Sequence, residues 1–446
     1  MLSVHGETTM KIELPLNHTL LLEGPAKIKI IDGTCSVFGA RIGKDETILL
    51  PSNKAIALHA TTNLSLEIQT NSGSRLREIA RSTIPKSWMD LSDYLNEATN
   101  QKKPFVVMFV GDIDKGKTTL ITFVANTLAE KDKRVGIIDA DIGQSDIGPP
   151  TTIGFGVLEK KEKILYLSQL ECKKAFFVGS TSPLGILNRS VVGVKTLTDY
   201  AKTLNLDVIL IDTTGWVMDK NARELKITKV FAVRPNLVVL LQKHNELNHI
   251  ARAISSTVEI KTVAPSPIIK RRSRQKRKRI RESLYSKYLK NGRNISLSFD
   301  SVSFGYSFLG TGAPITDNRI KTKIGQILNI YPDEILYAED ANDALVVITK
   351  SYFTPRSDQI NQLSRTFDKK EIRVVPVSSL SGIVVGLIGK NQEFLSIGVL
   401  RSINFQERMI TIYTTANASD VESILFGSIK IENHGEELGW IGHWFV

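Results

Sequence analysis

The pattern of hydrophobic and polar positions changes twice along this chain. Residues 11–69 and 294–446 carry short runs in which apolar and polar residues alternate, broken by Gly, Asp, Asn and Pro. Such runs are typical of antiparallel strands joined by turns. The middle third instead carries near-continuous apolar runs, separated by stretches with helical periodicity such as 191–204. Continuous apolar runs indicate strands that are buried on both faces.

The apolar runs of the middle third predict a parallel sheet with helices on both faces. They span residues 105–110, 134–139, 163–167, 175–178, 207–212 and 236–241. Ligands of such sheets bind at the carboxyl ends of the strands, so the polar residues that end these runs are site candidates. We divide the chain into an N-terminal β domain (1–73), a helical connector (74–103), a central α/β domain (104–293) and a C-terminal β-rich domain (294–446).

The segment that follows the run 105–110 has the composition of a phosphate-binding loop. Its residues are Gly111, Asp112, Ile113, Asp114, Lys115, Gly116, Lys117 and Thr118, with Thr119 next in the expected helix. The two glycines let successive N–H groups point at an anion, and the helix N-terminus adds partial positive charge. Lys117 would then reach the β- and γ-phosphates of a nucleotide, and Thr118 would bind Mg²⁺. The sequence therefore predicts an α/β fold of the P-loop NTPase type, flanked by smaller β-rich domains.

Two carboxylates close the strand that follows this helix. Asp139 and Asp141 alternate along the strand and therefore share a side, and Gln144 follows them. In a P-loop fold this edge faces the nucleotide phosphates. One carboxylate could complete the Mg²⁺ shell while the other accepts a proton from an attacking hydroxyl. The alternative is that both cap the loop or the next helix.

Two further segments end predicted strands with polar residues. Asp212 is followed by Thr-Thr-Gly and by Trp216, in the place where many P-loop proteins sense the γ-phosphate and the metal. Trp216 is either a core residue or a platform on which a nucleobase stacks. The segment 179–183 offers the hydroxyl groups of Thr181 and Ser182 to the same edge.

The positive charge of the chain is concentrated in one segment. The formal net charge is +12, and nine of the twelve residues from 270 to 281 are Lys or Arg with none acidic, so the remainder carries only +3. Such a run is usually a solvated face, a targeting signal or a tether. Here it lies between predicted structured segments and continues with helical character to about residue 288. An arginine-rich helix that folds over bound nucleotide would supply cations to the transferring phosphoryl group.

The remaining composition indicates a globular cytoplasmic protein that does not associate with a membrane. With 446 residues, of which 42% are hydrophobic, the chain is long enough for two or three domains. Its two cysteines are far apart and suggest neither a disulfide framework nor a zinc site. Residues 1–10 have no signal-peptide pattern, and no apolar stretch is long enough to span a bilayer. The seven histidines form no cluster, so none is assigned to metal or acid–base chemistry.

Taken together, these motifs resemble the polynucleotide 5′-hydroxyl kinase family, which includes the pre-mRNA cleavage-complex kinase and the nucleolar rRNA-processing kinases. The resemblance rests on the glycine loop with Asp114, on the segments 139–144, 179–183 and 212–216, and on the Arg-rich segment that ends at 279–282, in this order. Residues 33–40 add a likeness to the N-terminal β domain of the family.

The resemblance implies an activity and roles for particular residues. It implies transfer of the ATP γ-phosphate to the 5′-hydroxyl of RNA, with DNA as a second candidate and RNA-processing proteins as candidate partners. Lys117 and Thr118 would bind the phosphates and Mg²⁺, with Asp139 at the metal and Asp141 activating the hydroxyl. Gln144, Thr181, Ser182 and Trp216 would contact the substrate, the segment 179–183 with Trp216 forming a clasp. The basic segment, about 270–288, would be a lid, in which Arg277 and Arg281 are chosen by helical phase.

Two other functions remain open on the sequence alone. One is a GTPase-like switch, because Asp212-Thr-Thr-Gly also resembles a γ-phosphate sensor, although no Asn-Lys-x-Asp guanine motif is present. The other is a nucleotide-binding RNA-processing scaffold without kinase turnover. The presence of Lys117, Thr118, Asp139 and Asp141 argues against the scaffold without excluding it.

Overall fold

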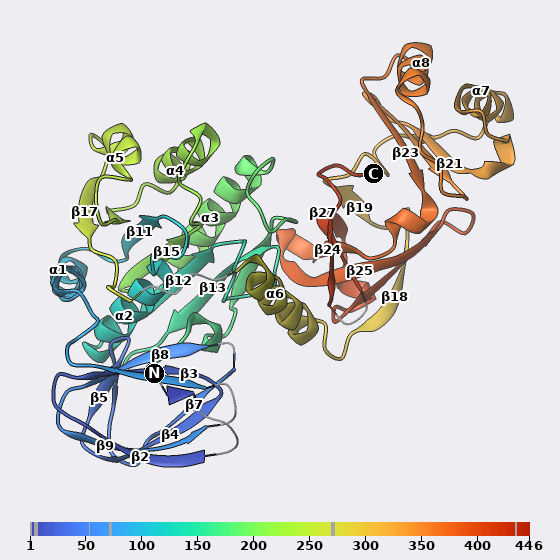
Figure 1. The fold of residues 1–446 in the computed structure, drawn as a ribbon. Coiled ribbons are helices and arrows are strands. Elements are labelled where there is room, and N and C mark those ends of the chain that lie inside the picture. Colours follow the sequence, from blue (N-terminus) through green and yellow to red (C-terminus); the bar gives the residue numbers. More distant parts are fainter. Residues whose placement is uncertain (1, 4–7, 53, 71–73, 269–272, 433–434) are drawn as a thin grey trace. The chain divides into compact units, whose positions relative to one another are not determined.

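The computed structural model describes residues 1–446 apart from 1, 4–7, 53, 71–73, 269–272 and 433–434 (Figure 1). The chain forms two compact units. The first contains Met1–Gly148, Ile153–Phe176 and Leu187–Arg274. The second contains Pro149–Thr152, Phe177–Ile186 and Gln275–Val446. In the described part of the chain no helix has both the length and the apolar composition needed to cross a membrane.

The first unit begins with a β domain built from two sheets. One sheet has the order β1 (Leu2–Ser3), β10 (Arg75–Ile79), β3 (Thr19–Glu23), β8 (Ala55–Ala60), β5 (Cys35–Val37) and β6 (Ala40–Ile42). The other has the order β2 (Thr8–Leu14), β9 (Leu64–Thr70), β4 (Ala26–Asp32) and β7 (Thr47–Leu50). The alternating apolar residues of these strands, such as Leu66 and Ile68, are buried in one shared core. The antiparallel β domain is therefore as its sequence pattern predicts.

The connector predicted as helical begins with a strand instead. Residues 75–79 form β10, which pairs with β3 and with β1. Leu76 is buried while Arg75 and Arg77 are exposed, an alternation with the period of a strand. The helix α1 (Lys86–Gln101) starts only after Pro85, whose fixed backbone angle suits the residue before a helix.

A seven-stranded sheet forms the centre of the first unit. Its order is β14 (Lys174–Phe177), β13 (Thr152–Leu158), β12 (Val135–Ala140), β15 (Val208–Thr213), β11 (Phe105–Gly111), β16 (Leu237–Leu241) and β17 (Glu259–Val263). The five strands from β12 to β17 are parallel, whereas β13 runs antiparallel to β12. Every residue of β11 is buried, as expected for a strand covered on both faces.

Helices cover both faces of this sheet (Figure 1). One face carries α1 and α2 (Lys117–Glu130), which pack together and against the core of the sheet. The other carries α3 (Leu187–Lys202), α4 (Lys220–Val233) and α5 (Asn248–Ile254), which pack in sequence order. The α/β sheet with helices on both faces confirms the predicted fold class, and the glycine loop stands between β11 and α2.

Several details of the central sheet differ from the prediction. The edge strand β17 was not predicted, and β13 runs antiparallel in a sheet predicted as parallel. The run 163–167 is not a strand, because it leads into a short 3₁₀ helix, η1 (Leu167–Gln169), and Ile164 N donates to the side chain of Asn126. The strand β13 was missed because Gly154 and Gly156 interrupt its apolar run. Gly154 is required there, since a Cβ would lie 1.9 Å from Ile147 O.

The second unit contains a large sheet and a smaller mixed one. The large sheet is antiparallel except at its edge, where β19 pairs parallel with β27. The large sheet has the order β18 (Arg293–Ser298), β26 (Met409–Thr414), β25 (Phe394–Asn404), β24 (Ile383–Ile388), β27 (Ser423–Ile431) and β19 (Ser303–Gly305), and β28 (Glu437–Trp440) pairs with β27. The smaller sheet contains β20 (Ala313–Pro314), β21 (Ile335–Asp340), β22 (Ala344–Thr349) and β23 (Glu371–Pro376), and is accompanied by α7 (Asn318–Leu328) and α8 (Ser357–Phe367). The C-terminal part is β-rich as predicted, with two helices that were not foreseen.

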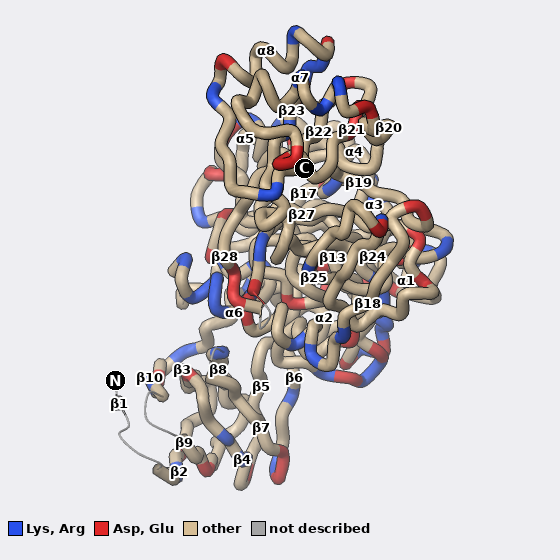
Figure 2. Tube along the Cα trace, turned by 90° about the vertical axis from the view of Figure 1, so that its right-hand side faces the viewer, with Lys and Arg blue, Asp and Glu red and all other residues tan. Residues whose placement is uncertain are grey.

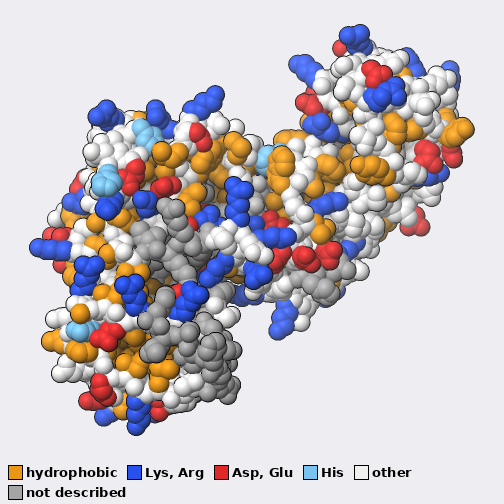
Figure 3. Space-filling view, viewed as in Figure 1, with side chains coloured by type: hydrophobic (Ala, Val, Ile, Leu, Met, Phe, Trp, Pro, Cys, Tyr) orange, Lys and Arg blue, Asp and Glu red, His pale blue; other side chains and the backbone are white. Residues whose placement is uncertain are grey.

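The basic segment forms the helix α6 (Arg274–Tyr288), in which Figure 2 marks Lys and Arg in blue. Lys270, Arg271 and Arg272, the first residues of the predicted lid, lie outside the described residues. Tyr285 is fully buried in a core that also contains Phe177 and Val384. Residues 275–293 therefore cluster with the C-terminal unit, whereas the predicted division assigned them to the central domain. Elsewhere, basic and acidic side chains are interspersed over the face seen in Figure 3, in line with the small charge outside this segment.

Candidate active site

The glycine loop has the backbone and the buried lysine of a phosphate cradle. Gly116 adopts a left-handed conformation (φ 92°) as the residue that caps α2, a conformation that glycine reaches without strain. The ammonium of Lys117 is buried and donates to Gly111 O (2.9 Å) and Asp112 O (3.0 Å). The lysine thus lies folded along the loop, in a position from which it can transfer its hydrogen bonds to phosphate oxygens.

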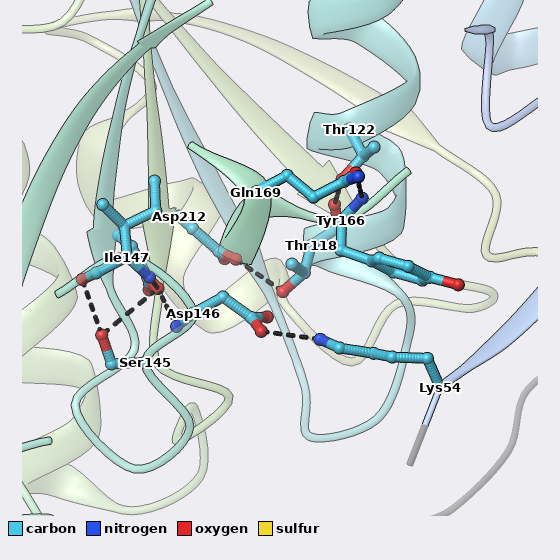
Figure 4. Close-up of polar contacts among 10 residues, drawn as sticks. Lys54, Thr118, Thr122, Ser145, Asp146, Ile147, Tyr166, Gln169 and Asp212 are labelled. Carbon is cyan, nitrogen blue, oxygen red and sulfur yellow. Dashed lines mark hydrogen bonds and ion pairs between the residues drawn. The ribbon is translucent and has the colours of Figure 1, made fainter. Parts of the chain in front are cut away.

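Thr118 and Asp212 form the central pair of the site. The Thr118 hydroxyl donates to Asp212 Oδ2 at 2.6 Å, and the two side chains point toward one another in Figure 4. The other oxygen, Asp212 Oδ1, is buried and has no hydrogen-bond partner in the described part of the chain. Burial raises the pKa of Asp212 to about 6, although the nearby Lys117 ammonium acts in the opposite direction.

An orphaned, buried carboxylate oxygen beside a threonine hydroxyl fits a divalent cation. Mg²⁺ prefers hard oxygen ligands, and it is commonly held by one or two protein groups together with substrate phosphates and water. Within the described residues no three His, Cys, Asp or Glu side chains form a group that could hold a metal ion by themselves. Thr118 and Asp212 are the residues that would hold it. The sequence placed Asp212 at a sensor of the γ-phosphate and the metal, but it assigned the metal to Thr118 and Asp139.

Asp139 organises the loop that follows β12. Its Oδ2 accepts from the backbone N–H groups of Asp146 (2.5 Å) and Ile147 (3.0 Å), and its Oδ1 accepts from Asp141 N (3.1 Å). Burial raises the pKa of Asp139 well above its usual value, with Asp212 and Asp146 adding to the effect. Both oxygens of Asp139 therefore accept hydrogen bonds from the backbone of the loop. For Asp139, this agrees with the alternative that the two aspartates cap the loop. The metal role predicted for Asp139 stays a prediction.

Asp141 is in a different environment from Asp139. It is half-buried, and its carboxylate accepts a hydrogen bond from Gly143 N at 3.3 Å. Its charge contributes to raising the pKa of Asp212, so the two carboxylates belong to one electrostatic cluster. Asp141 thus keeps lone pairs available for a reacting group. Gln144 is half-buried in the same loop.

The N-terminal β domain contributes a lysine to this cluster, which sequence reasoning missed. Lys54 Nζ pairs with Asp146 Oδ1 at 2.9 Å and lies 5.0 Å from the centre of the Tyr166 ring (Figure 4). Both partners of the ion pair are largely buried. No signal in the sequence could have connected residues that are 92 positions apart. The pair links the β domain to the loop that Asp139 holds.

Trp216 is not a core residue. It is half-buried, whereas Trp88 in α1 is fully buried. Its indole N–H donates to Asp219 Oδ2 at 2.7 Å, and the other Asp219 oxygen caps α4 by accepting from Ala222 N. The ring is therefore held in one orientation at the surface of the first unit. A stacking role for Trp216 stays a prediction.

Four of the predicted site residues belong to the second unit. Thr181 and Ser182 lie in a segment that is fixed to β27, because Ser428 N and Ser428 Oγ both donate to Gly179 O (2.7 and 3.0 Å). Arg277 and Arg281 lie on α6. Arg281 forms a bidentate pair with Glu437 through Nε and Nη2 (2.8 and 3.0 Å), and both side chains are largely buried.

The structure thus brings together the loop 111–119 with Asp139, Asp141, Gln144 and Trp216 in one unit. The sheet order, the loop between β11 and α2, the folded-back lysine and the Thr118–Asp212 pair define the class of P-loop nucleotide-binding proteins.

The family follows from comparison with known proteins. Residues 111–291 match the family model described as the mRNA cleavage and polyadenylation factor CLP1 P-loop. The polyribonucleotide 5′-hydroxyl-kinase of Pyrococcus furiosus is 33% identical over 76% of this chain and 91% of its own length. That of Pyrococcus abyssi is 34% identical over the same shares. This chain belongs to the polyribonucleotide 5′-hydroxyl-kinase family.

A solved structure extends the likeness to nearly the whole chain. Clp1p in the wild-type Clp1p–Pcf11p complex superposes with a TM-score of 0.64, covering 96% of this chain and 99% of Clp1p. The identity is only 11%, so this comparison concerns the fold alone. It supports the P-loop sheet with further β-rich regions at both ends.

Proposed function

We propose that this protein is an ATP-dependent polynucleotide 5′-hydroxyl kinase, which transfers the γ-phosphate of ATP to the 5′-hydroxyl of RNA. The observation that carries the proposal is Asp141, a carboxylate beside the phosphate loop that keeps acceptor capacity while its neighbour Asp139 is used in holding the loop. A carboxylate with acceptor capacity beside the phosphate loop can take the proton of an attacking hydroxyl, which transfer to an alcohol requires. The relatives from Pyrococcus carry the same activity in their names.

The chain's own residues divide the work of the reaction. The loop N–H groups and Lys117 bind the β- and γ-phosphates, and Thr118 and Asp212 would hold Mg²⁺. Bound Mg²⁺ supplies positive charge to the phosphate oxygens. Asp141 accepts the proton of the 5′-hydroxyl as the hydroxyl oxygen attacks the γ-phosphorus. Lys117 stabilises the negative charge that develops on the leaving oxygen of ADP.

The test is transfer of radiolabelled γ-phosphate from ATP to short oligonucleotides. We expect labelling of RNA that ends in a 5′-hydroxyl and no labelling of the same RNA with a 5′-phosphate. A DNA oligonucleotide of the same sequence tells whether DNA is a second substrate. ATP binding without transfer to either nucleic acid would refute the kinase and favour a scaffold.

Asp212→Asn should lower kcat and raise the Mg²⁺ concentration that the reaction needs. The amide keeps the shape and the bond with Thr118 but removes the negative charge at the orphaned oxygen. Loss of a charge that stabilises the transition state costs about 100-fold or more in kcat. Titrating activity and ATP affinity with Mg²⁺ measures this, and Asp139→Asn is the comparison. If Asp139→Asn shifts the Mg²⁺ titration while Asp212→Asn does not, the metal ligand is Asp139, as the motif alone predicts.

Trp216→Ala should raise the KM for the oligonucleotide while the KM for ATP stays nearly unchanged. Stacking on an aromatic ring is worth about 1–3 kcal/mol per base and tolerates any base, which suits an enzyme that acts on ends of varied sequence. Trp216→Phe keeps a ring and should keep most of the affinity. Both are measured by steady-state kinetics with RNA of several 5′ bases.

The fully buried Trp88 provides the matched control for Trp216. Truncating a core tryptophan costs roughly 3–5 kcal/mol of stability. Trp88→Ala should therefore lower the Tm and reduce the activity with ATP and with RNA alike. A large fall in Tm for Trp216→Ala, or an unchanged KM for RNA, would return Trp216 to a structural role.

The residues of the second unit complete the proposal. The substrate-contact role of Thr181 and Ser182 and the lid role of α6 stay predictions. Arg281 could contact a phosphate only after its ion pair with Glu437 opens. Arg277 is therefore our first candidate for the arginine that contacts a phosphate. The unpaired cysteines fit a cytoplasmic enzyme, and RNA-processing proteins are its proposed partners. The matching Clp1p structure, in which Clp1p is in complex with Pcf11p, supports a protein partner.

A further inference from the structure

The helix α4 buries two lysine side chains beneath the active site. Lys226 is fully buried and Lys229 is 1% exposed. Lysine is almost never fully buried unless its ammonium is paired, because removing the charge from water costs several kcal/mol. The two residues are three positions apart on one helix, yet their surroundings differ. That difference indicates what Lys226 does.

Lys226 holds the turn that follows Asp212. Its ammonium donates to Thr213 Oγ1 (3.0 Å), Thr214 O (2.5 Å) and Thr214 Oγ1 (3.0 Å). All three donor positions of the ammonium are therefore used on two consecutive residues. Thr213 Oγ1 in turn donates to Phe109 O in β11 (2.7 Å), the strand that leads into the glycine loop. The turn is thus tied to the sheet and to α4 at once.

The front of the same turn rests against the glycine loop. At Gly215 an added Cβ would lie 2.6 Å from Ile113 Cα and 2.8 Å from Ile113 N. No side chain fits between these two backbones, and the contact needs glycine for this reason. The turn is held between Lys226 behind it and the loop in front of it, and Asp212 is the residue immediately before it.

We propose that Lys226 is a positioning residue for phosphoryl transfer. Its ammonium fixes the turn 213–215, and through the turn it fixes the Asp212 carboxylate and the loop backbone at Ile113. The expected change in kcat rests on the proposed kinase function. The expected change in Mg²⁺ and ATP binding rests only on the geometry of the nucleotide site. Lys226 touches no reacting atom, so its effect must appear through Mg²⁺ and nucleotide binding.

The electrostatic surroundings are consistent with this role. Burial lowers the pKa of Lys226 well below its ordinary value, and Lys229 and Lys117 add to the effect, while Asp141 and Asp212 oppose it. The three acceptors and the two carboxylates favour the charged ammonium, against the cost of its burial. An apolar side chain of the same length would fill the space but would leave Thr214 O without its donor.

Lys229 provides the matched control. Its ammonium is buried in the same helix and has no hydrogen-bond partner in the described part of the chain. Burial lowers its pKa to about 8, and Asp141 opposes that shift. Replacing an unpaired buried amine with an apolar chain of similar length is expected to be neutral or stabilising. Lys229→Met thus removes a buried lysine without releasing the turn.

The experiment compares Lys226→Met, Lys229→Met and the wild-type chain. Tm, ATP affinity with and without Mg²⁺ in the absence of RNA, and kcat and KM for 5′-hydroxyl RNA are measured for each. For Lys226→Met we expect a fall of at least about 10-fold in kcat, a weaker gain of ATP affinity from Mg²⁺, and an unchanged KM for RNA. For Lys229→Met we expect wild-type values within about two-fold.

Each outcome decides whether Lys226 positions the turn 213–215 for catalysis or only stabilises the fold. Lys226→Met with wild-type kcat and wild-type Mg²⁺ response overturns the proposal, and so does an equal loss in both variants. If Lys226→Met does not fold, Thr214→Val removes one acceptor while leaving Lys226 in place, and it must show the same weakened Mg²⁺ response or the proposal fails. A wild-type chain that binds ATP with Mg²⁺ but transfers no phosphate refutes the kinase, while the binding measurements still decide the role of Lys226.

Discussion

Lys117→Ala is expected to abolish phosphate transfer and to weaken ATP binding strongly. The Lys117 ammonium is buried and lies along the loop, where it bonds the carbonyl groups of Gly111 and Asp112. Its removal takes away the charge that we propose to bind the β- and γ-phosphates, and also two hydrogen bonds to the loop. Because the cradle and the charge act as one unit, both binding and transfer fall. Calorimetric ATP titration and the transfer assay measure the two effects.

The matched control is Lys131→Ala at the other end of α2. Lys131 is an exposed residue that pairs with Asp93, and a surface ion pair of this kind contributes about 0–1 kcal/mol. The control therefore changes the net charge equally and should keep full activity. A folded Lys117→Ala protein with full kinase activity would exclude the phosphate-loop assignment.

Asp141→Asn is expected to lose turnover while keeping most of its ATP affinity. The amide has the shape of the carboxylate but cannot accept the proton of the 5′-hydroxyl. General base catalysis contributes typically about 10²–10⁴-fold, and a loss of this size in kcat is expected. The ATP affinity should change little, because the proposed contacts with the phosphates come from the loop, from Lys117 and from Mg²⁺ on Thr118 and Asp212. Single-turnover transfer measured beside ATP titration separates the two quantities.

Asp139→Asn tests whether Asp141, and not Asp139, is the group that accepts the proton. Its carboxylate accepts bonds from three backbone N–H groups, and an amide nitrogen placed toward any of them leaves a buried donor unsatisfied. Such a loss costs about 1–3 kcal/mol, so Asp139→Asn should lower the Tm. If instead it leaves the Tm unchanged and abolishes turnover, while Asp141→Asn stays active, the roles of the two carboxylates must be exchanged.

The parts of the fold that were predicted correctly are those with a strong local signal. The runs of β11, β12, β15 and β16 are continuous and apolar because both faces of the strand are covered. The strand β13 was missed because Gly154 and Gly156 serve close backbone contacts rather than a hydrophobic face. The strand β10 was missed because its five residues contain two arginines and a glutamate, so that it has only one buried apolar position.

The residues of the site, too, could be predicted only where the signal is local in sequence. The glycine loop is contiguous in sequence, so its residues could be recognised as one unit. Contacts between distant segments could not be identified, because no local pattern reports them. Lys54 reaches Asp146 from another domain, and Lys226 reaches Thr214 from the next helix. Whether Asp139 or Asp141 is free to react also depended on where the loop 141–147 places its N–H groups.

The way in which the backbone divides between the two units restricts how this enzyme can be shortened or recombined. The chain passes from one unit to the other five times, and the segment Phe177–Ile186 belongs to the unit that ends at Val446. A fragment that stops at residue 293 would lose Ser428, which holds Gly179, and Glu437, which holds Arg281. The second unit is therefore not a detachable appendage. A chimaera made with a single junction would separate these segments from their support, and exchange between relatives would have to replace the whole chain or several segments at once.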